Sequence, residues 1–200
     1  MSHKLNASEA VMIFGDLQEG ITDLQSTSSE KDLRRSAGAL ARIAELHNIP
    51  TLALSIPNTG GENPSILSEI EDARSEITYV HRTRPDSFEV EDFRTALDRT
   101  GRTALIVCGV ATEIVVMWLA LSGAAKGYRV HLVVDACGAL SKLTGDAALS
   151  RIEAAGVTLT SVYSLASEVS GDFTVSPGKE TIDIVYELVS AGHCNGSPTR

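Results

Sequence analysis

The chain has 200 residues, of which 43% are hydrophobic, and its formal net charge at pH 7 is −9. A chain of this length buries its core as one unit, so we expect a single domain over residues 1–190. The acidic balance, without a basic stripe, argues against nucleic acid as a partner. No apolar run reaches the roughly 18 residues of a membrane span and the first residues are polar, so no membrane partner and a cytoplasmic location are predicted.

Short runs of β-branched and apolar residues alternate with longer helical patterns along the whole chain. This alternation predicts βαβ units and a parallel sheet with helices on both faces. We therefore predict a three-layer α/β/α domain of Rossmann-like topology, with about six mainly parallel strands. The expected strands are residues 10–14, 51–55, 77–81, 104–108, 130–134 and 157–160.

Helices are expected between these strands. Ser29 with Asp32 forms a candidate capping box for the first helix. Helical patterns after the first helix cover residues 66–73, 91–99, 113–125, 146–155 and 180–188, and Thr144 is the expected cap of the helix at 146–155. A polar segment rich in Gly, Ser and Pro over residues 191–200 predicts a disordered tail.

The predicted helix from Glu113 to Ala125 is apolar on nearly every side. Such a helix is buried on two faces, and only one of them can meet the sheet. In a monomer the other face would leave Trp118 in water, so we expect that face to contact a second subunit. The chain is therefore expected to form a homo-oligomer, a dimer or larger, through this helix.

Three segments meet at the carboxyl ends of the predicted strands, where open parallel sheets bind their ligands. They are Asp16 with Gln18, Arg82 with Arg84, and the turn at residues 109–112. A carboxylate directly after an apolar strand suits an acid or a base, and Arg82 is placed to pair with it or to hold a substrate carboxylate. The alternatives are that Asp16 only caps the next loop and that both arginines are solvated charges, with Arg84 competing for the role of Arg82.

One histidine and two cysteines near this edge are candidate bases or nucleophiles. His81 precedes Arg82, but strand alternation directs it to the opposite face, which favours a packed or surface histidine. Cys108 lies inside an apolar strand and Cys137 in a loop without an evident base, so neither is a favoured nucleophile. The cysteines, of which Cys194 falls in the tail, have no metal-type spacing and predict neither a disulfide framework nor a zinc site.

Four segments together carry a resemblance to a known family. They are residues 15–18, residues 82–93 with Ser87-Phe88 and Asp92-Phe93, residues 105–113, and residues 127–136. From Val11 to about Phe173 the chain resembles the isochorismatase-like hydrolases. The resemblance implies a parallel, doubly wound sheet, an oligomer, and a cis peptide bond at Val110-Ala111 that shapes an oxyanion pocket.

The cysteine members of that family use an aspartate, a lysine and a cysteine, and the resemblance assigns each role to a position here. Asp16 matches the aspartate, Arg82 takes the lysine position, and Val115 falls on the cysteine position. Around these catalytic positions we expect six residues to bind substrate: Gln18, Arg84, Phe88, Val110, Ala111 and Thr112.

Val115 has no group that can attack a substrate, so the acyl-enzyme route of the amidase members is disfavoured. No Asp and His pair occurs at residues 55–58 after the second strand, so we predict no metal and no other cofactor. For isochorismatases proper, the resemblance implies an aspartate that acts as general acid toward a vinyl ether. A nearby Arg82 would lower the pKa of such an acid, so isochorismate is not assigned as the substrate.

Three functional hypotheses follow. The leading one is a hydrolase that acts on a small polar or carboxylate-bearing molecule without a cysteine nucleophile, with Asp16 as general acid or base and Arg82 as electrostatic anchor. The second is a catalytically inactive family member that serves as a binding or interaction protein. The third is a rearranged enzyme that recruits Cys137 or Cys108.

Overall fold

Six strands form one sheet in the order β3-β2-β1-β4-β5-β6 in the computed structural model, which describes residues 4–193. Every neighbouring pair is parallel. The strands are β1 (Ala10–Gly15), β2 (Thr51–Ser55), β3 (Thr78–His81), β4 (Ala104–Val110), β5 (Arg129–Gly138) and β6 (Thr158–Thr160). The predicted fold class and all six predicted strands are therefore confirmed.

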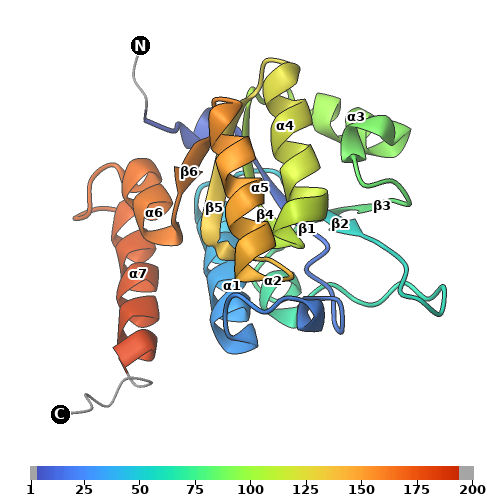
Figure 1. The fold of residues 1–200 in the computed structure, drawn as a ribbon. Helices are drawn as coiled ribbons and strands as arrows, with labels where there is room; N and C mark the ends of the chain where they lie inside the picture. The colour runs from blue at the N-terminus through green and yellow to red at the C-terminus, as the bar shows by residue number, and fades with distance from the viewer. Residues whose placement is uncertain (1–3, 194–200) are drawn as a thin grey trace.

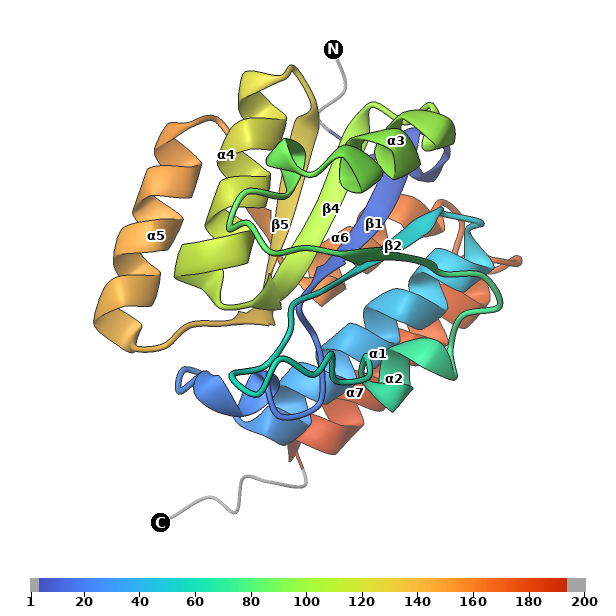
Figure 2. The same ribbon diagram turned by 90° about the vertical axis from the view of Figure 1, so that its right-hand side faces the viewer.

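Helices cover both faces of this sheet, as Figures 1 and 2 show. In Figure 2, α3, α4 and α5 lie on one side and α1, α6 and α7 on the other. The helices are α1 (Glu30–Leu46), α2 (Ser68–Glu71), α3 (Glu91–Thr100), α4 (Met117–Ala125), α5 (Lys142–Ala154), α6 (Val162–Ser170) and α7 (Gly178–His193). Because parallel strands lie between two helix layers, β1 and β4 are buried at every residue and their sequences are continuously apolar.

The helices differ in part from the sequence prediction, and α4 begins only at Met117, after a π-helical segment over Thr112–Val116. Helix α5 begins at Lys142 with Ser141 as its N-cap, whose Oγ accepts from the backbone N–H of Thr144, so Thr144 lies inside the helix and is not the cap. Helix α6 was not predicted. Helix α7 continues to His193, so residues 191–193 of the predicted tail are helical, and residues 194–200 lie outside the described residues.

The first helix starts as the sequence predicts. Ser29 is the N-cap of α1, and its side chain accepts from the backbone N–H of Asp32 at 3.1 Å. Its hydroxyl also donates to the carboxylate of Asp32 at 2.6 Å. The bond from the Asp32 N–H to the Ser29 hydroxyl satisfies one of the free N–H groups in the first turn of α1.

Helix α4 is less exposed in one chain than its apolar sequence suggests. Its residues Met117, Leu119, Ala120 and Gly123 are buried. The guanidinium of Arg151 from α5 lies over the Trp118 ring, 5.3 Å from the ring centroid. Trp118 is therefore only partly exposed in a single chain, because a cation on the neighbouring helix covers part of the ring.

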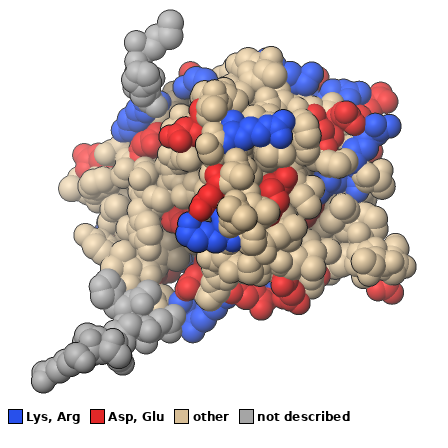
Figure 3. Space-filling model, viewed as in Figure 1, with Lys and Arg blue, Asp and Glu red and all other residues tan. Residues whose placement is uncertain are grey.

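Charged side chains of both signs are interspersed on the face drawn in Figure 3. Lys and Arg alternate there with Asp and Glu without forming a continuous field of one sign. In the described part of the chain, every helix is too short or too polar to cross a membrane.

Candidate functional site

The carboxyl ends of β1 and β4 approach each other closely at Gly15 and Gly109, which are register partners. A Cβ on Gly109 would lie 2.2 Å from the carbonyl oxygen of Gly15, so only glycine fits at this position. Directly after Gly15, Asp16 adopts a φ of 53°, in the left-handed region that aspartate tolerates better than most residues. The chain thus turns sharply at the strand end and places a carboxylate there.

Asp16 and Arg82 form a buried ion pair across the ends of three strands. Nε of Arg82 donates to Oδ1 of Asp16 at 3.0 Å and Nη2 donates to Oδ2, so the contact is bidentate. Arg82 follows β3 and reaches past the end of β2, where its backbone N–H donates to the carbonyl of Ser55 at 2.9 Å. The structure therefore pairs Asp16 with Arg82 and leaves Arg84 outside the pair.

The environment of Asp16 changes its proton affinity. Burial raises the pKa of the Asp16 carboxyl, and the charge and hydrogen bonds of Arg82 only partly offset this rise. Sequence reasoning identified both effects, but the degree of burial follows only from the fold. A carboxyl group with a raised pKa is better suited to proton transfer near neutral pH than an ordinary aspartate.

Val115 lies beside Gly15, the residue that precedes this carboxylate. It belongs to η4 (Thr112–Val116), a π-helical segment between β4 and α4, and segments of this type are frequent at functional sites. The side chain is fully buried, and its methyl groups would lie 3.3 and 3.5 Å from a Cβ on Gly15. Since Asp16 follows Gly15 directly, Val115 packs an apolar side chain against the backbone that carries the carboxylate.

The segment before η4 is also buried. The Val110–Ala111 peptide bond is cis, as the family resemblance implies. Val110, Ala111 and Thr112 are each 8% exposed or less. Thr112 lines a cavity of about 780 Å³ together with Asp135 and Cys137 of β5. Thr112 therefore borders a cavity at β5 and does not border the separate cavity that lies beside Arg82.

Gln18 is buried, and the loop that follows β2 engages its side-chain amide. Oε1 of Gln18 accepts from the backbone N–H of Ile56 at 2.8 Å. Nε2 donates to the carbonyl of Pro64 at 2.7 Å and to Oδ1 of Asn63 at 3.2 Å. Gln18 therefore holds the 56–64 loop beside the strand ends, and its expected role in binding substrate stays a prediction.

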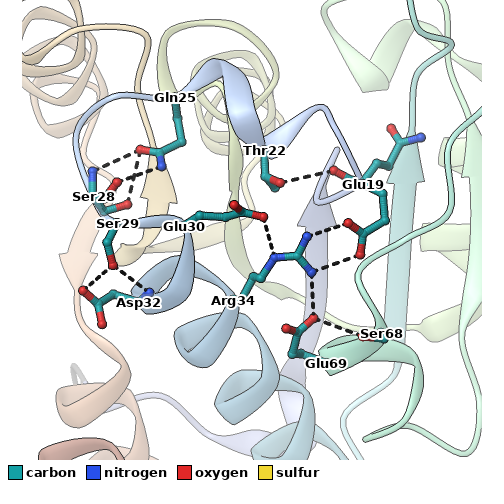
Figure 4. A network of polar contacts seen from close by, with 11 residues as sticks. Glu19, Thr22, Gln25, Ser28, Ser29, Glu30, Asp32, Arg34, Ser68 and Glu69 are labelled. Carbon is teal, nitrogen blue, oxygen red and sulfur yellow. Dashed lines mark hydrogen bonds and ion pairs between the residues drawn. The ribbon is translucent and has the colours of Figure 1, made fainter. Parts of the chain in front are cut away.

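Ion pairs of Arg34 hold the loop after β1, which carries Asp16 and Gln18 (Figure 4). Arg34 of α1 binds Glu19 at 2.5 Å, Glu30 at 2.8 Å and Glu69 of α2 at 3.2 Å. Three carboxylates from different segments thus share one guanidinium. The loop after β1 is in this way tied to both α1 and α2.

The two remaining predicted binding residues lie in different environments. Arg84 is exposed, and its guanidinium pairs with Glu89 at 2.9 Å. Phe88 is buried, with its ring edge-on to Phe93 at a centroid distance of 5.1 Å and 6.0 Å from the Tyr128 ring. Phe88 therefore packs in the core beside α3, away from the ion pair, because an aromatic ring at this position gains more from burial than from exposure.

A cavity of about 390 Å³ opens beside Arg82. This volume lies within the range of small-molecule sites. Its lining residues are Pro57, Asn63, His81, Arg82, Thr83, Arg84 and Val90. Asp16 is not among them, so Arg82 stands between the carboxylate and the cavity. The nitrogen donors of two arginines and one histidine suit a ligand with negative charge.

His81 is a cavity residue that sequence reasoning assigned to the opposite face from Arg82. It is an exposed histidine, as expected, but it lines the same cavity as Arg82. Because β3 ends at His81, strict alternation no longer fixes the relative direction of the next side chain. Nδ1 of His81 lies 2.6 Å from Oγ of Ser55 and 2.5 Å from Nδ2 of Asn63, and no sequence pattern signals these contacts.

The cysteines are poorly placed for nucleophilic catalysis. Cys108 is fully buried, and Cys137 is 8% exposed and lies within β5, not in a loop as expected. Burial raises the pKa of Cys137 to about 12 and that of Cys108 well above its usual value. Thiols of this kind are largely protonated near neutral pH. Cys194 lies outside the described residues.

The described residues do not form a recognisable metal site. Within residues 4–193, no group of three or more His, Cys, Asp or Glu side chains is arranged to hold a metal ion. At the cavity, Arg82 and Arg84 stay protonated and do not coordinate metals, which leaves His81 as a single candidate nitrogen ligand.

Comparison with known proteins agrees with the fold. A family model described as the isochorismatase domain matches residues 10–164. The chain belongs to this family. Among curated relatives, the probable hydrolase YcaC of Escherichia coli K12 is 29% identical over 171 residues, which cover 85% of this chain and 82% of YcaC.

Two solved structures of the family are similar over almost the whole chain. YcaC from Pseudomonas aeruginosa, solved with hexane-2,5-diol and covalent acrylamide, is 28% identical with a TM-score of 0.84 and covers 96% of this chain and 98% of its own. The E. coli YcaC structure, described as an octameric hydrolase of unknown specificity, is 26% identical with a TM-score of 0.84 and covers 98% and 99%. These relatives place the chain among isochorismatase-like hydrolases.

Proposed function

We propose that this isochorismatase-like protein hydrolyses a small polar or carboxylate-bearing molecule without a cysteine nucleophile. The observation that carries the proposal is the buried Asp16–Arg82 pair, whose guanidinium borders a cavity rich in nitrogen donors. In this proposal Asp16 is the general acid or base, and Arg82 anchors the substrate electrostatically. No cofactor takes part.

Arg82 has donors left for a ligand. A guanidinium carries five N–H groups. Three of them donate to Asp16 Oδ1, Asp16 Oδ2 and the carbonyl of Arg84. The two others are available for a carboxylate in the cavity without breaking the ion pair. A bidentate arginine and carboxylate contact would fix the orientation of the substrate.

Asp16 keeps capacity for proton transfer. Each carboxylate oxygen accepts about two hydrogen bonds, and Arg82 uses one site on each oxygen. As a base, Asp16 takes a proton from water while the water oxygen bonds to the electrophilic carbon of the substrate. When the bond to the leaving group breaks, the same proton passes from Asp16 to that group. The raised pKa of Asp16 supports both transfers.

The absence of a covalent intermediate rests on Val115, which we place at the cysteine position of the family. A valine side chain cannot form an acyl-enzyme. The buried, protonated thiols of Cys108 and Cys137 are poor substitutes, which argues against the rearranged enzyme. Water is then the nucleophile. In this proposal Gln18, Arg84 and the segment Val110–Thr112 contact the substrate.

We also propose that the chain assembles as a homo-oligomer through the 113–125 segment. The E. coli YcaC relative is octameric, which supports assembly here. Ile114 remains 42% exposed in a single chain, and Trp118 is only partly covered by Arg151. A second subunit would remove this apolar surface from water.

The test is a screen of the full chain against small amides, esters and vinyl ethers, each with and without a carboxylate. We expect turnover of a carboxylate-bearing compound, and a fall in kcat of about 100-fold or more in Asp16→Asn. Cys137→Ala should leave turnover unchanged. Circular dichroism checks the fold of each variant, and Arg82→Lys, which keeps the charge without the bidentate fork, should raise KM for carboxylate substrates.

Other results of the screen would overturn this proposal. Loss of turnover in Cys137→Ala would identify a thiol mechanism. Turnover that survives in folded Asp16→Asn would remove Asp16 from the chemistry. If no compound is turned over while carboxylates still bind, the chain is the inactive, ligand-binding family member.

A further inference from the structure

The cavity beside Arg82 contains a histidine whose ring is held by a chain of hydrogen bonds. The chain runs from the backbone of the 56–64 loop through Gln18 and Asn63 to His81. The proposed function makes no use of His81. The direction of each hydrogen bond in the chain nevertheless determines which ring nitrogen carries the proton.

The orientation of the Gln18 amide is fixed by backbone groups. A backbone N–H can only donate and a backbone carbonyl can only accept. Oε1 of Gln18 faces the N–H of Ile56 at 2.8 Å, and Nε2 faces the carbonyl of Pro64 at 2.7 Å. Rotating this amide by 180° would therefore lose both bonds. Nε2 is the donor that also meets Oδ1 of Asn63 at 3.2 Å.

This orientation fixes Asn63 in turn. Because Oδ1 of Asn63 accepts from Gln18, Nδ2 faces the other way, 3.2 Å from Oγ of Ser55 and 2.5 Å from Nδ1 of His81. An amide nitrogen only donates, so Nδ1 of His81 accepts and carries no proton. The neutral ring then has its proton on Nε2.

Nε2 of His81 is free to use that proton on a ligand. Among residues 4–193 it has no hydrogen-bond partner, and His81 is an exposed residue that lines the cavity with Arg82 and Arg84. One fixed N–H donor thus lines the same cavity as Arg82 and Arg84. A carboxylate brings a negative charge and about four lone-pair sites to such donors, whereas a neutral amide oxygen offers fewer lone pairs and no charge.

We propose that His81 is a specificity residue that donates its Nε2–H to a carboxylate of the ligand, and that Asn63 and Gln18 are positioning residues that set this tautomer. The inference rests on the proposed function only for its link to catalysis, since the tautomer and carboxylate binding are independent of turnover. It assigns the anionic end of the substrate to the cavity and the reacting end to the side of Asp16.

The tautomer is read by nitrogen NMR of the ¹⁵N-labelled full chain near neutral pH, with the His81 signals identified by their loss in His81→Gln. We expect an unprotonated Nδ1 and a proton-bearing Nε2. In Asn63→Asp a carboxylate oxygen, which accepts, replaces the Asn63 amide nitrogen, which donates, so the proton of the His81 ring should move to Nδ1. Asn58→Asp is the matched control: it makes the same change in the same loop without a contact to His81 and should leave the tautomer unchanged.

Ligand selectivity is tested by titrating acetate and propionate against acetamide and propionamide while following the backbone amide signals of the residues that line the cavity. We expect the carboxylates to bind more tightly than the matched amides. Their affinity should fall about tenfold in His81→Leu, the loss of one hydrogen bond to a charged group, and less in His81→Gln, which retains a donor.

The outcomes separate this inference from the proposed function. A proton on Nδ1, two averaged tautomers, or equal binding of acids and amides would overturn the role of His81 whatever the substrate screen finds. Selective carboxylate binding without any turnover would support His81 and count against the hydrolase proposal.

Discussion

The guanidinium of Arg82 lies against the carboxylate of Asp16, and the two side chains are only 1% and 3% exposed. Water therefore screens this pair weakly. Each charge also depends on the other, because a buried ion that loses its partner keeps its full desolvation cost. The pair is thus a structural contact of the strand ends as well as the centre of the proposed chemistry.

Replacing one member of this pair should be strongly destabilising. In Asp16→Asn the guanidinium of Arg82 stays buried without its counter-ion, and we expect the free energy of unfolding to fall by roughly 3–5 kcal/mol. The double variant Asp16→Asn with Arg82→Gln should recover part of this loss. Urea denaturation of the three proteins measures both effects.

The matched control for the buried pair is the exposed pair of Arg84 and Glu89. Solvent screens these two charges, so Arg84→Gln should change the free energy of unfolding by roughly 0–1 kcal/mol. A loss in Asp16→Asn no larger than in this control would mean that the buried pair contributes little to stability.

Acid should destabilise the fold through His131 in β5. The ring is 4% exposed and its Nδ1 has no partner, and burial lowers the pKa of His131 below its usual 6.5. The unfolded chain thus takes up a proton near pH 6.5, whereas the folded chain does so only at lower pH. The free energy of unfolding should therefore fall as the pH drops below 6.5 toward the lowered value.

His131→Leu removes this titration. Urea unfolding between about pH 7.5 and about pH 5 should show a shallower loss of stability in the variant than in the parent chain. His47, whose pKa burial also lowers, keeps its share of the effect in both proteins. Identical slopes would show that His131 does not couple folding to pH.

Assembly through the 113–125 segment can be tested at Ile114. This side chain is 42% exposed, so Ile114→Glu should be tolerated by a single chain but should place a charge in the proposed interface. Light scattering across a range of concentrations should give a smaller particle for the variant than for the parent. Tyr186→Glu is the control, because Tyr186 is 66% exposed on α7, on the opposite side of the sheet.

Sequence patterns predicted the sheet well because parallel strands buried on both faces leave an unmistakable apolar signature. Thr51–Ser55 was located to the residue, and the strand ends carrying Asp16 and Arg82 were correct. Helix α6 was missed because its nine residues follow a three-residue strand with little separation. Local periodicity is weak in such short elements.

The site was only partly visible in the sequence. Adjacency to apolar strands indicated Asp16 and Arg82, but the contacts of His81 depend on Asn63, which is 18 positions away in a loop. The burial of Phe88 could not be predicted, since an aromatic ring next to a polar loop gives no sign of whether it packs inward, and its expected role in binding substrate stays a prediction. Such choices are made by tertiary packing and not by local pattern.

Restoring a thiol at position 115 tests whether Val115 occupies the cysteine position of the family. In Val115→Cys the sulfur would lie beside Gly15 and Asp16, where a carboxylate can take its proton. We expect acrylamide, which is bound covalently in the P. aeruginosa YcaC structure, to modify this cysteine faster than Cys108 or Cys137. Mass spectrometry of the peptides locates the adduct. The rate should fall when Asp16→Asn is added, and modification that is absent or independent of Asp16 would show that position 115 is not a nucleophile site.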